Sequence, residues 1–243
     1  LRNLFYGRDK SVHLQEYLVN PDRVDGSPDA RLPPASAGRR FGDSESGDYP
    51  QGRDEWRKFD AIILGDLDPA ELPDAVVEDI RYAVEERGAL LVVVAGPEAM
   101  PHRIRNATLL EMLPVAFTSA EGDRRTPPEA EFHLRLAPAG RGHPVMMQSS
   151  SSFENESIWD EVPVLRWRQA VDGVKPGAEV LAYAAAADDE PASAAQLAVR
   201  EIEEDPEAAV RRLSEMRETQ AKNALVVARS FGQGKVLMLT TDQ

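Results

Sequence analysis

The chain has 243 residues, of which 42% are hydrophobic and 29% charged, a composition that suits one α/β domain with a sizeable core. Its formal net charge of −14 opposes binding to phosphate backbones and anionic membrane surfaces, so no nucleic-acid partner is expected. The chain has no cysteine, which excludes disulfides, thiolate metal sites and a cysteine nucleophile. No apolar run approaches the roughly 18 to 20 residues of a membrane span, so direct membrane insertion is not expected.

The first quarter of the chain is mostly polar. Residues 1–8 predict the end of a helix, and residues 12–19 predict a strand. Residues 22–55 are rich in Pro, Gly, Ser, Asp and Arg, with few apolar positions. This composition predicts a long flexible excursion from the domain.

A strand–helix pattern begins after the excursion. Residues 59–64 form a short apolar run that is typical of a buried parallel strand. Apolar residues then recur at helical spacing over 73–87, and Gly88 predicts the end of that helix. Residues 89–95 form the strongest predicted strand, and residues 108–113 predict a short helix. The alternation predicts a doubly wound, mostly parallel sheet with helices on both faces.

The second half is less regular. Residues 132–136 and 179–184 predict strands, residues 142–144 a turn, and the serine run 149–152 a polar linker. Residues 188–222 are charged and rich in alanine, and they predict a helical insertion on the surface. Within it, Asp205-Pro206 is a typical helix start, and one narrow apolar stripe follows it: Val210, Leu213 and Met216.

The last predicted elements are two strands, 225–228 and 236–239, joined by a glycine-containing turn into a β-hairpin. The turn sequence Gly232-Gln233-Gly234-Lys235 lacks the first Gly and the Ser or Thr of a phosphate loop. Neither the glycine fingerprint of a dinucleotide site nor the Gly-x-Ser-x-Gly pentad of a serine hydrolase occurs.

Polar residues follow two of the predicted parallel strands at their carboxyl ends. Ligands of open α/β sheets bind at this edge, so we expect a ligand-binding rim there. Its candidate residues are Asp66, Asp68, Gly96, Pro97, Glu98 and His102. The carboxylates and the histidine could bind a divalent cation or do acid–base chemistry, or Asp66 and Asp68 could cap the next turn or helix.

The remaining histidines and the tryptophans indicate less. His13, His133 and His143 form no metal-ligand spacing, and the sequence predicts no metal site and no cofactor. His143, between Gly142 and Pro144, is typical of a turn residue whose ring bonds the backbone. Trp56, Trp159 and Trp167 could stack on a sugar ring, although tryptophan is more often part of a core or an interface.

A set of motifs in a fixed order resembles the glutamine amidotransferase-like domains of large bacterial proteins, often from planctomycetes, that carry membrane helices. The resemblance covers most of the chain outside 22–55 and 188–222. Its motifs are residues 59–69, residues 86–97, Gly142-His143-Pro144, Trp159 with Pro163, residues 175–181 and residues 232–242. It implies one domain over residues 1–243, with a flavodoxin-like, class I glutamine amidotransferase-like fold, in a fragment of a longer, membrane-anchored bacterial protein.

The resemblance also locates where the family's wider superfamily carries its nucleophilic cysteine. The matching turn here reads Ala95-Gly96-Pro97-Glu98, with no nucleophile and with a proline that lacks an N–H. Gly142-His143-Pro144 is not the superfamily's His-Pro-Glu, because Val145 replaces the acid. No catalytic residue is therefore assigned. Three functions remain open: a non-catalytic module that binds a small molecule or protein partner, a hydrolase that uses the acidic residues and His102, and a carbohydrate-binding domain.

Overall fold

The computed structural model describes residues 49–117, 131–186 and 206–242, together with six positions between Ser11 and Val19. The chain divides into two compact units, Leu1–Lys58 and Phe59–Gln243. The predicted helix end at 1–8 and residues 22–48 of the predicted excursion lie outside the described residues. So do residues 188–205 of the predicted insertion.

The first unit contains one short described helix. Helix α2 (Arg53–Trp56) follows Gly52 and contains the buried Trp56. Glu55 accepts a hydrogen bond from the backbone N–H of Gln51 at 2.7 Å, and the rings of Tyr17 and Tyr49 meet edge to face. None of the six described positions of residues 11–19 belongs to a strand, so the strand predicted over 12–19 is not seen at these positions.

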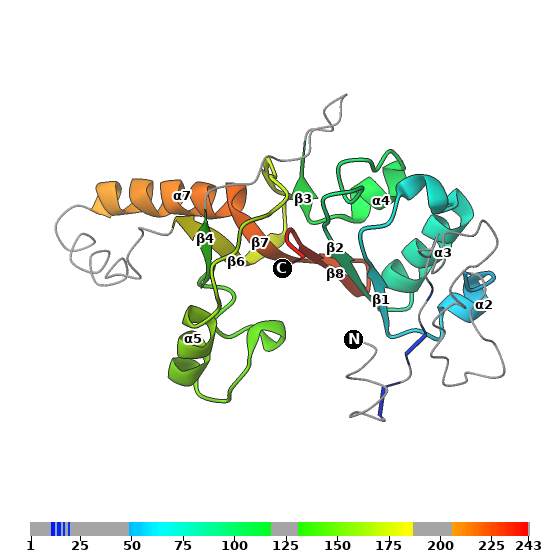
Figure 1. Ribbon diagram of the computed structural model, residues 1–243, viewed down its shortest axis with the longest axis horizontal. Coiled ribbons are helices and arrows are strands. Elements are labelled where there is room, and N and C mark those ends of the chain that lie inside the picture. The colour runs from blue at the N-terminus through cyan, green and yellow to red at the C-terminus, as the bar shows by residue number, and fades with distance from the viewer. Residues whose placement is uncertain are drawn as a thin grey trace, which may run out of the picture. The chain divides into compact units, whose positions relative to one another are not determined.

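The second unit is built on a six-stranded mixed sheet (Figure 1). In spatial order the strands are β1 (Ala61–Leu64), β2 (Leu90–Val94), β8 (Gly234–Leu239), β7 (Ala224–Phe231), β6 (Ala178–Ala186) and β4 (Phe132–Leu136). The β1–β2 and β2–β8 pairs are parallel, and the other three pairs are antiparallel. The α/β class is confirmed, but the prediction of a mostly parallel sheet is wrong.

The antiparallel half of the sheet has a local cause. A two-residue turn, Gly232-Gln233, joins β7 to β8, and Gly232 has a φ of 58°. So short a turn forces the two strands to be antiparallel, whereas parallel neighbours need a long crossover. The predicted hairpin is confirmed, with longer strands than expected, and β6 and β4 continue the antiparallel pairing beyond it.

The predicted helices of the parallel half are confirmed. Helix α3 (Asp74–Glu85) buries Val77, Ile80 and Val84, and Gly88 follows it with a φ of 81°. Helix α4 (Ala107–Met112) begins at Asn106, whose side-chain oxygen accepts the N–H of Leu109 at 2.9 Å. The short 3-10 helix η1 (Pro69–Glu71) precedes α3. Helices α3 and α4 lie against each other.

The 131–186 segment contains more structure than its sequence predicts. The serine run is not a linker, because Ser151 caps helix α5 (Ser152–Asp160) through the N–H of Glu154. The turn at 142–144 leads into the 3-10 helix η2 (Pro144–Met146). In addition, β5 (Gly173–Val174) of this segment pairs with β3 (Val115–Ala116), which lies outside it, in a separate two-stranded sheet.

The described part of the insertion is helix α7 (Pro206–Lys222), as its Asp-Pro start predicts. The helix lies along β5 and β6. Its apolar residues Val210, Leu213 and Met216 are 63%, 38% and 40% exposed, which confirms a surface helix.

The two faces of the parallel half are covered unequally. Residues 62, 64, 91, 93, 236 and 238 share one face and are 0% to 7% exposed. A Cβ built on Gly234, which belongs to that face, would lie 3.1 Å from a methyl group of Val84, so we call it the α3 face. The opposite face carries Ile63, which is 44% exposed, Leu237, which is 7% exposed, and four half-buried residues: Leu90, Val92, Val94 and Leu239. We call this the open face.

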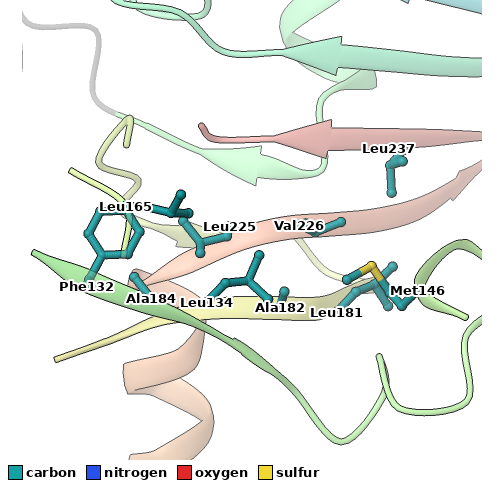
Figure 2. Packing of buried hydrophobic residues seen from close by; sticks show 10 residues of the cluster. All are labelled: Phe132, Leu134, Met146, Leu165, Leu181, Ala182, Ala184, Leu225, Val226 and Leu237. Atoms are coloured by element: carbon teal, nitrogen blue, oxygen red, sulfur yellow. The ribbon is translucent and has the colours of Figure 1, made fainter. Parts of the chain in front are cut away.

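Cover on the open-face side is concentrated at the other end of the sheet. A cluster of buried residues from β4, β6, β7 and β8 includes Phe132, Leu181, Val226 and Leu237, and Met146 of η2 belongs to it (Figure 2). Trp159 of α5 packs against this cluster, as do Leu90, Val92 and Leu239 of the open face. Among the described residues, α3 covers one face of β1, β2 and β8. The helix layer that the sequence predicts on their other face therefore stays a prediction.

Candidate functional site

The carboxyl ends of β1, β2 and β8 lie at one edge of the sheet, because the three strands are parallel. Gly65 and Asp66 follow β1, and Ala95 and Gly96 follow β2. The backbone N–H of Ala95 donates to the carbonyl of Leu239 at 2.8 Å, which joins the ends of β2 and β8. We call this edge, with its loops 65–68, 95–102 and 240–242, the carboxyl-end rim.

Asp66 binds the backbone of the loop that follows β2. Its carboxylate accepts hydrogen bonds from the N–H groups of Glu98, Ala99 and Met100 at 2.8, 2.8 and 2.7 Å. The N–H of Gly96 donates to the carbonyl of Met100 at 2.9 Å, and Pro97 has none. Every backbone donor between residues 96 and 100 is therefore engaged within the protein.

Gly96 is required by this arrangement. A Cβ built on it would lie 2.2 Å from Cγ of Asp66, closer than any real contact. The small residue at position 96 lets the carboxylate approach the loop. The sequence predicts that Asp66 and Gly96 share the rim, and the structure shows that they are in direct contact.

Asp68 has two structural partners. One carboxylate oxygen accepts the N–H of Ala70 at 3.0 Å and caps η1. The other forms an ion pair with Nη1 of Arg103 at 3.1 Å, with both side chains about half exposed. This is the capping role that the sequence left open for Asp68, and an exposed pair of this kind adds at most about 1 kcal/mol to stability.

The other two candidate side chains lie on the same loop. Glu98 is exposed, and its backbone N–H binds Asp66. His102 is half-buried, and its carbonyl accepts a hydrogen bond from Nη1 of Arg105 at 3.0 Å. No group of three His, Asp or Glu side chains within residues 49–117, 131–186 and 206–242 is placed to hold a metal ion.

Two threonines fix the 240–242 loop of the rim through hydrogen bonds. The hydroxyl of Thr240, which is fully buried, donates to the carbonyl of Ala224 at 2.7 Å. The hydroxyl of Thr241 donates to the carbonyl of Trp167 at 2.8 Å. Asp242, the next residue, is exposed. The rim therefore presents acidic side chains on a backbone that is fixed by hydrogen bonds.

A second polar cluster, at the end of α4, was not predicted from the sequence. The ammonium of Lys175 donates to the carbonyls of Leu110 and Glu111, and Nη1 of Arg229 donates to the Glu111 carbonyl at 3.0 Å. Arg81 bonds the Glu111 carboxylate at 3.1 Å. These residues come from four distant segments, so no local motif could have indicated the cluster.

The charges of this cluster affect one another. Burial lowers the pKa of Lys175 below its ordinary value, and the nearby Arg229 lowers it further, while Glu111 opposes the shift. A hydrogen bond to Glu85 raises the pKa of Arg81. Cations at the carboxyl end of a helix interact favourably with its dipole and its last carbonyls. The cluster therefore caps α4.

The histidine and tryptophan candidates also have structural surroundings. Nδ1 of His143 accepts the N–H of Val145 at 3.3 Å and caps η2, so the predicted backbone bond is confirmed. The indole N–H of Trp159 donates to the carbonyl of Met146 at 2.7 Å. Trp56 is buried, and Trp167 is half-buried. None of the three presents a fully exposed ring.

No helix in the described ranges combines the length and the apolar character that a bilayer crossing needs. The sequence matches no protein-family profile, and no curated protein matches it. Solved structures do resemble it. Cytoplasmic Protein STM3548 from Salmonella typhimurium superimposes with a TM-score of 0.51 at 16% sequence identity, over 80% of this chain and 65% of that chain.

Cytoplasmic Protein STM1381 from Salmonella typhimurium LT2 gives a TM-score of 0.49 at the same identity and coverage. The chain thus spans about two thirds of the length of each of these proteins. At this level of identity the similarity to STM3548 shows a shared α/β fold and nothing about activity.

Proposed function

We propose that this chain is a non-catalytic domain of the class I glutamine amidotransferase-like type, which binds a ligand or partner at the carboxyl-end rim. The observation that carries the proposal is the state of the loop after β2. It offers no nucleophile, and all of its backbone donors from Gly96 to Met100 are engaged, three of them by the Asp66 carboxylate.

Acyl-transfer catalysis needs free donors at this place. An oxyanion hole requires N–H groups that point at the position where the negative charge develops. Here the N–H groups of Glu98, Ala99 and Met100 already donate to the Asp66 carboxylate, and Pro97 has no N–H to offer. Since the chain also has no cysteine, a cysteine-dependent amidotransferase reaction is not possible.

The two alternative functions receive less support. A hydrolase that uses Asp66 and Asp68 would need side chains free to move protons, whereas both carboxylates bind backbone N–H groups and Asp68 also pairs with Arg103. A sugar-binding platform built on the tryptophans needs an exposed indole ring, and the rings of Trp56, Trp159 and Trp167 are buried or half-buried.

The proposal is tested by assaying the chain for hydrolysis of glutamine and of p-nitrophenyl acetate. We expect rates equal to those of buffer alone, and equal rates for an Asp68→Asn/His102→Gln double variant. Turnover above buffer that the double variant loses would overturn the proposal and support the hydrolase. Turnover that survives in the double variant would overturn it as well, and would locate the chemistry elsewhere.

A further inference from the structure

The open face of β1, β2 and β8 is an apolar surface that the proposed function does not use. Parallel strands occur almost always with both faces covered, and their sequences are apolar throughout for that reason. Here the strands read AIIL, LLVVV and GKVLML. Within residues 59–117, 131–186 and 206–242, α3 covers one face, while Ile63 on the other is 44% exposed.

We propose that the open face binds an amphipathic α-helix of a partner protein, with the amino end of that helix at the carboxyl-end rim. This inference rests on the proposed function, because it specifies the partner that a non-catalytic domain of this kind binds. The contact residues on the sheet are Ile63, Leu90, Val92, Val94 and Leu239.

The dimensions of the open face fit one helix. Leu237 of β8 is only 7% exposed within the neighbouring cluster, so the uncovered part of the face lies over β1 and β2, where one helix of about 10 Å diameter could lie beside that cluster. The five residues of β2 extend over about 16 Å, the length of about eleven helical residues. An apolar stripe at i, i+3 or i+4, and i+7 would cover that length.

Charge sets the direction and the character of the helix. Asp66, Glu98 and Asp242 lie at the carboxyl ends of the three strands, whereas the amino-end edge carries both Lys235 of β8 and the exposed Asp60 before β1. The amino end of a helix dipole is positive, so it is favoured beside the acidic rim, and its negative end is favoured beside Lys235. Basic residues before the first turn of the partner helix would add to this attraction.

Charge also distinguishes such a partner from a second copy of the chain. Each copy carries a net charge of −14, so charge repulsion opposes the association of two copies. In addition, η2 and α5 pack on the neighbouring part of the same side of the sheet, through Met146 and Trp159. A helix can lie beside α5 as another member of that layer, whereas a flat second sheet would meet α5 as an obstacle.

The test uses the full 243-residue chain, labelled at its Ile, Leu and Val methyl groups for NMR. The probe is a synthetic helical peptide of three to four turns, with leucines at i, i+3 and i+7 and lysines at its amino end. Two control peptides have the same composition with scrambled leucines, or glutamates in place of the lysines. We expect saturable shifts of the Ile63, Leu90 and Val92 methyl signals with the first peptide and weaker binding of both controls.

Two matched variants locate the contact. Ile63→Glu places a charge on the open face and should weaken binding at least about tenfold, because burying an unpaired charge is unfavourable. Val210→Glu makes the same kind of change at a 63% exposed residue of α7 and should leave the affinity unchanged. A thermal scan checks that both variants fold, and Ile63→Gln replaces Ile63→Glu if that variant does not.

Four results would overturn the inference: no saturable binding, equal binding of the scrambled peptide, shifts centred on α7, or an affinity that Ile63→Glu leaves intact. A dimer in sedimentation that Ile63→Glu dissociates would assign the face to a second copy. Contacts from the open-face methyls to another segment of the free chain would assign it to the chain itself. Each of these also contradicts the proposal. Hydrolytic activity, by contrast, would overturn the proposed function and leave helix binding standing.

Discussion

The two faces of β1 and β2 are made from alternate residues of the same short strands, yet their surroundings differ. Ile62 and Leu91 are 6% and 0% exposed beneath α3, whereas their neighbours Ile63 and Leu90 lie on the open face, where Ile63 is 44% exposed. Both faces are equally apolar in sequence. The difference shows that hydrophobic sequence reports the burial a strand is suited to, and that the covering layer has to be found in three dimensions.

The largest expected effect is a difference in stability between alanine variants of the two leucines of β2. Leu91→Ala removes a fully buried side chain from the α3 face and should lower the free energy of unfolding by about 2 to 5 kcal/mol. Leu90→Ala, the same change on the open face, should lower it by about 1 kcal/mol. Urea denaturation of both variants measures the difference. Equal losses would mean that the open face is covered as completely as the α3 face.

At the carboxyl-end rim, where both faces end, the stability of the protein should be sensitive to substitution of Gly96. Gly96→Ala places a methyl group 2.2 Å from Cγ of Asp66 and should displace the carboxylate from its three N–H donors, at a cost of about 2 kcal/mol. The same change in an Asp66→Gly background should cost less than about 1 kcal/mol. Gly65→Ala is the matched control, since nothing lies within 4 Å of its built Cβ. Additive losses in the double variant would contradict the contact.

The neighbouring α5 layer depends on one buried amide. Asn155 is fully buried on α5, and its side-chain oxygen accepts the N–H of Gln148 at 2.7 Å. Asn155→Ala should reduce stability by about 1 to 2 kcal/mol, because it leaves that N–H without its acceptor. The exposed Ser157→Ala change on the same helix is the control. Loss of protection of the Gln148 amide in hydrogen exchange would show the cause directly.

The smallest effect concerns the cap of α4, the helix that lies beside α3. Since burial lowers the pKa of folded Lys175, the unfolded chain binds more protons at this residue at pH values just below its ordinary pKa. The free-energy cost of burying the charged ammonium lowers stability in full at neutral pH, and this cost decreases as the pH rises toward 10.5 and the group loses its proton. Wild type should therefore gain stability relative to Lys175→Met over that range. Urea denaturation at a series of alkaline pH values measures this, and a constant difference would contradict the shift.

The parallel half of the fold could be predicted because its signals are local. The apolar runs of β1 and β2, the helical spacing of α3 and the stop at Gly88 each lie within a few residues. Strand direction is different, because it depends on which strands become neighbours. The sequence of β6 does not say that β7 will pair with it in the antiparallel sense, and the mostly parallel prediction failed for that reason.

The candidate site shows the same division. The sequence predicted that Asp66, Gly96 and Glu98 follow the ends of parallel strands and therefore lie at one edge of the sheet, and the structure places them there. The contact that defines the site joins residues 32 to 34 positions apart, and only the folded loop reveals it. The helix α5 was not predicted because a run of four serines is typical of a linker. Only the structure shows that the side chain of Ser151 accepts the N–H of Glu154 and caps the helix.

The position of β8 in the sheet has a consequence for how the protein is made. β8 is the last described strand in the chain, yet it lies between β2 and β7 and joins the two halves of the sheet. A ribosome that adds about 5 to 20 residues per second needs roughly 7 to 30 s to pass from Val94 to Leu239. During that time the nascent chain holds an apolar β2 with no neighbour on its β8 side. We therefore expect newly made chains to depend on chaperones until β8 has left the ribosome.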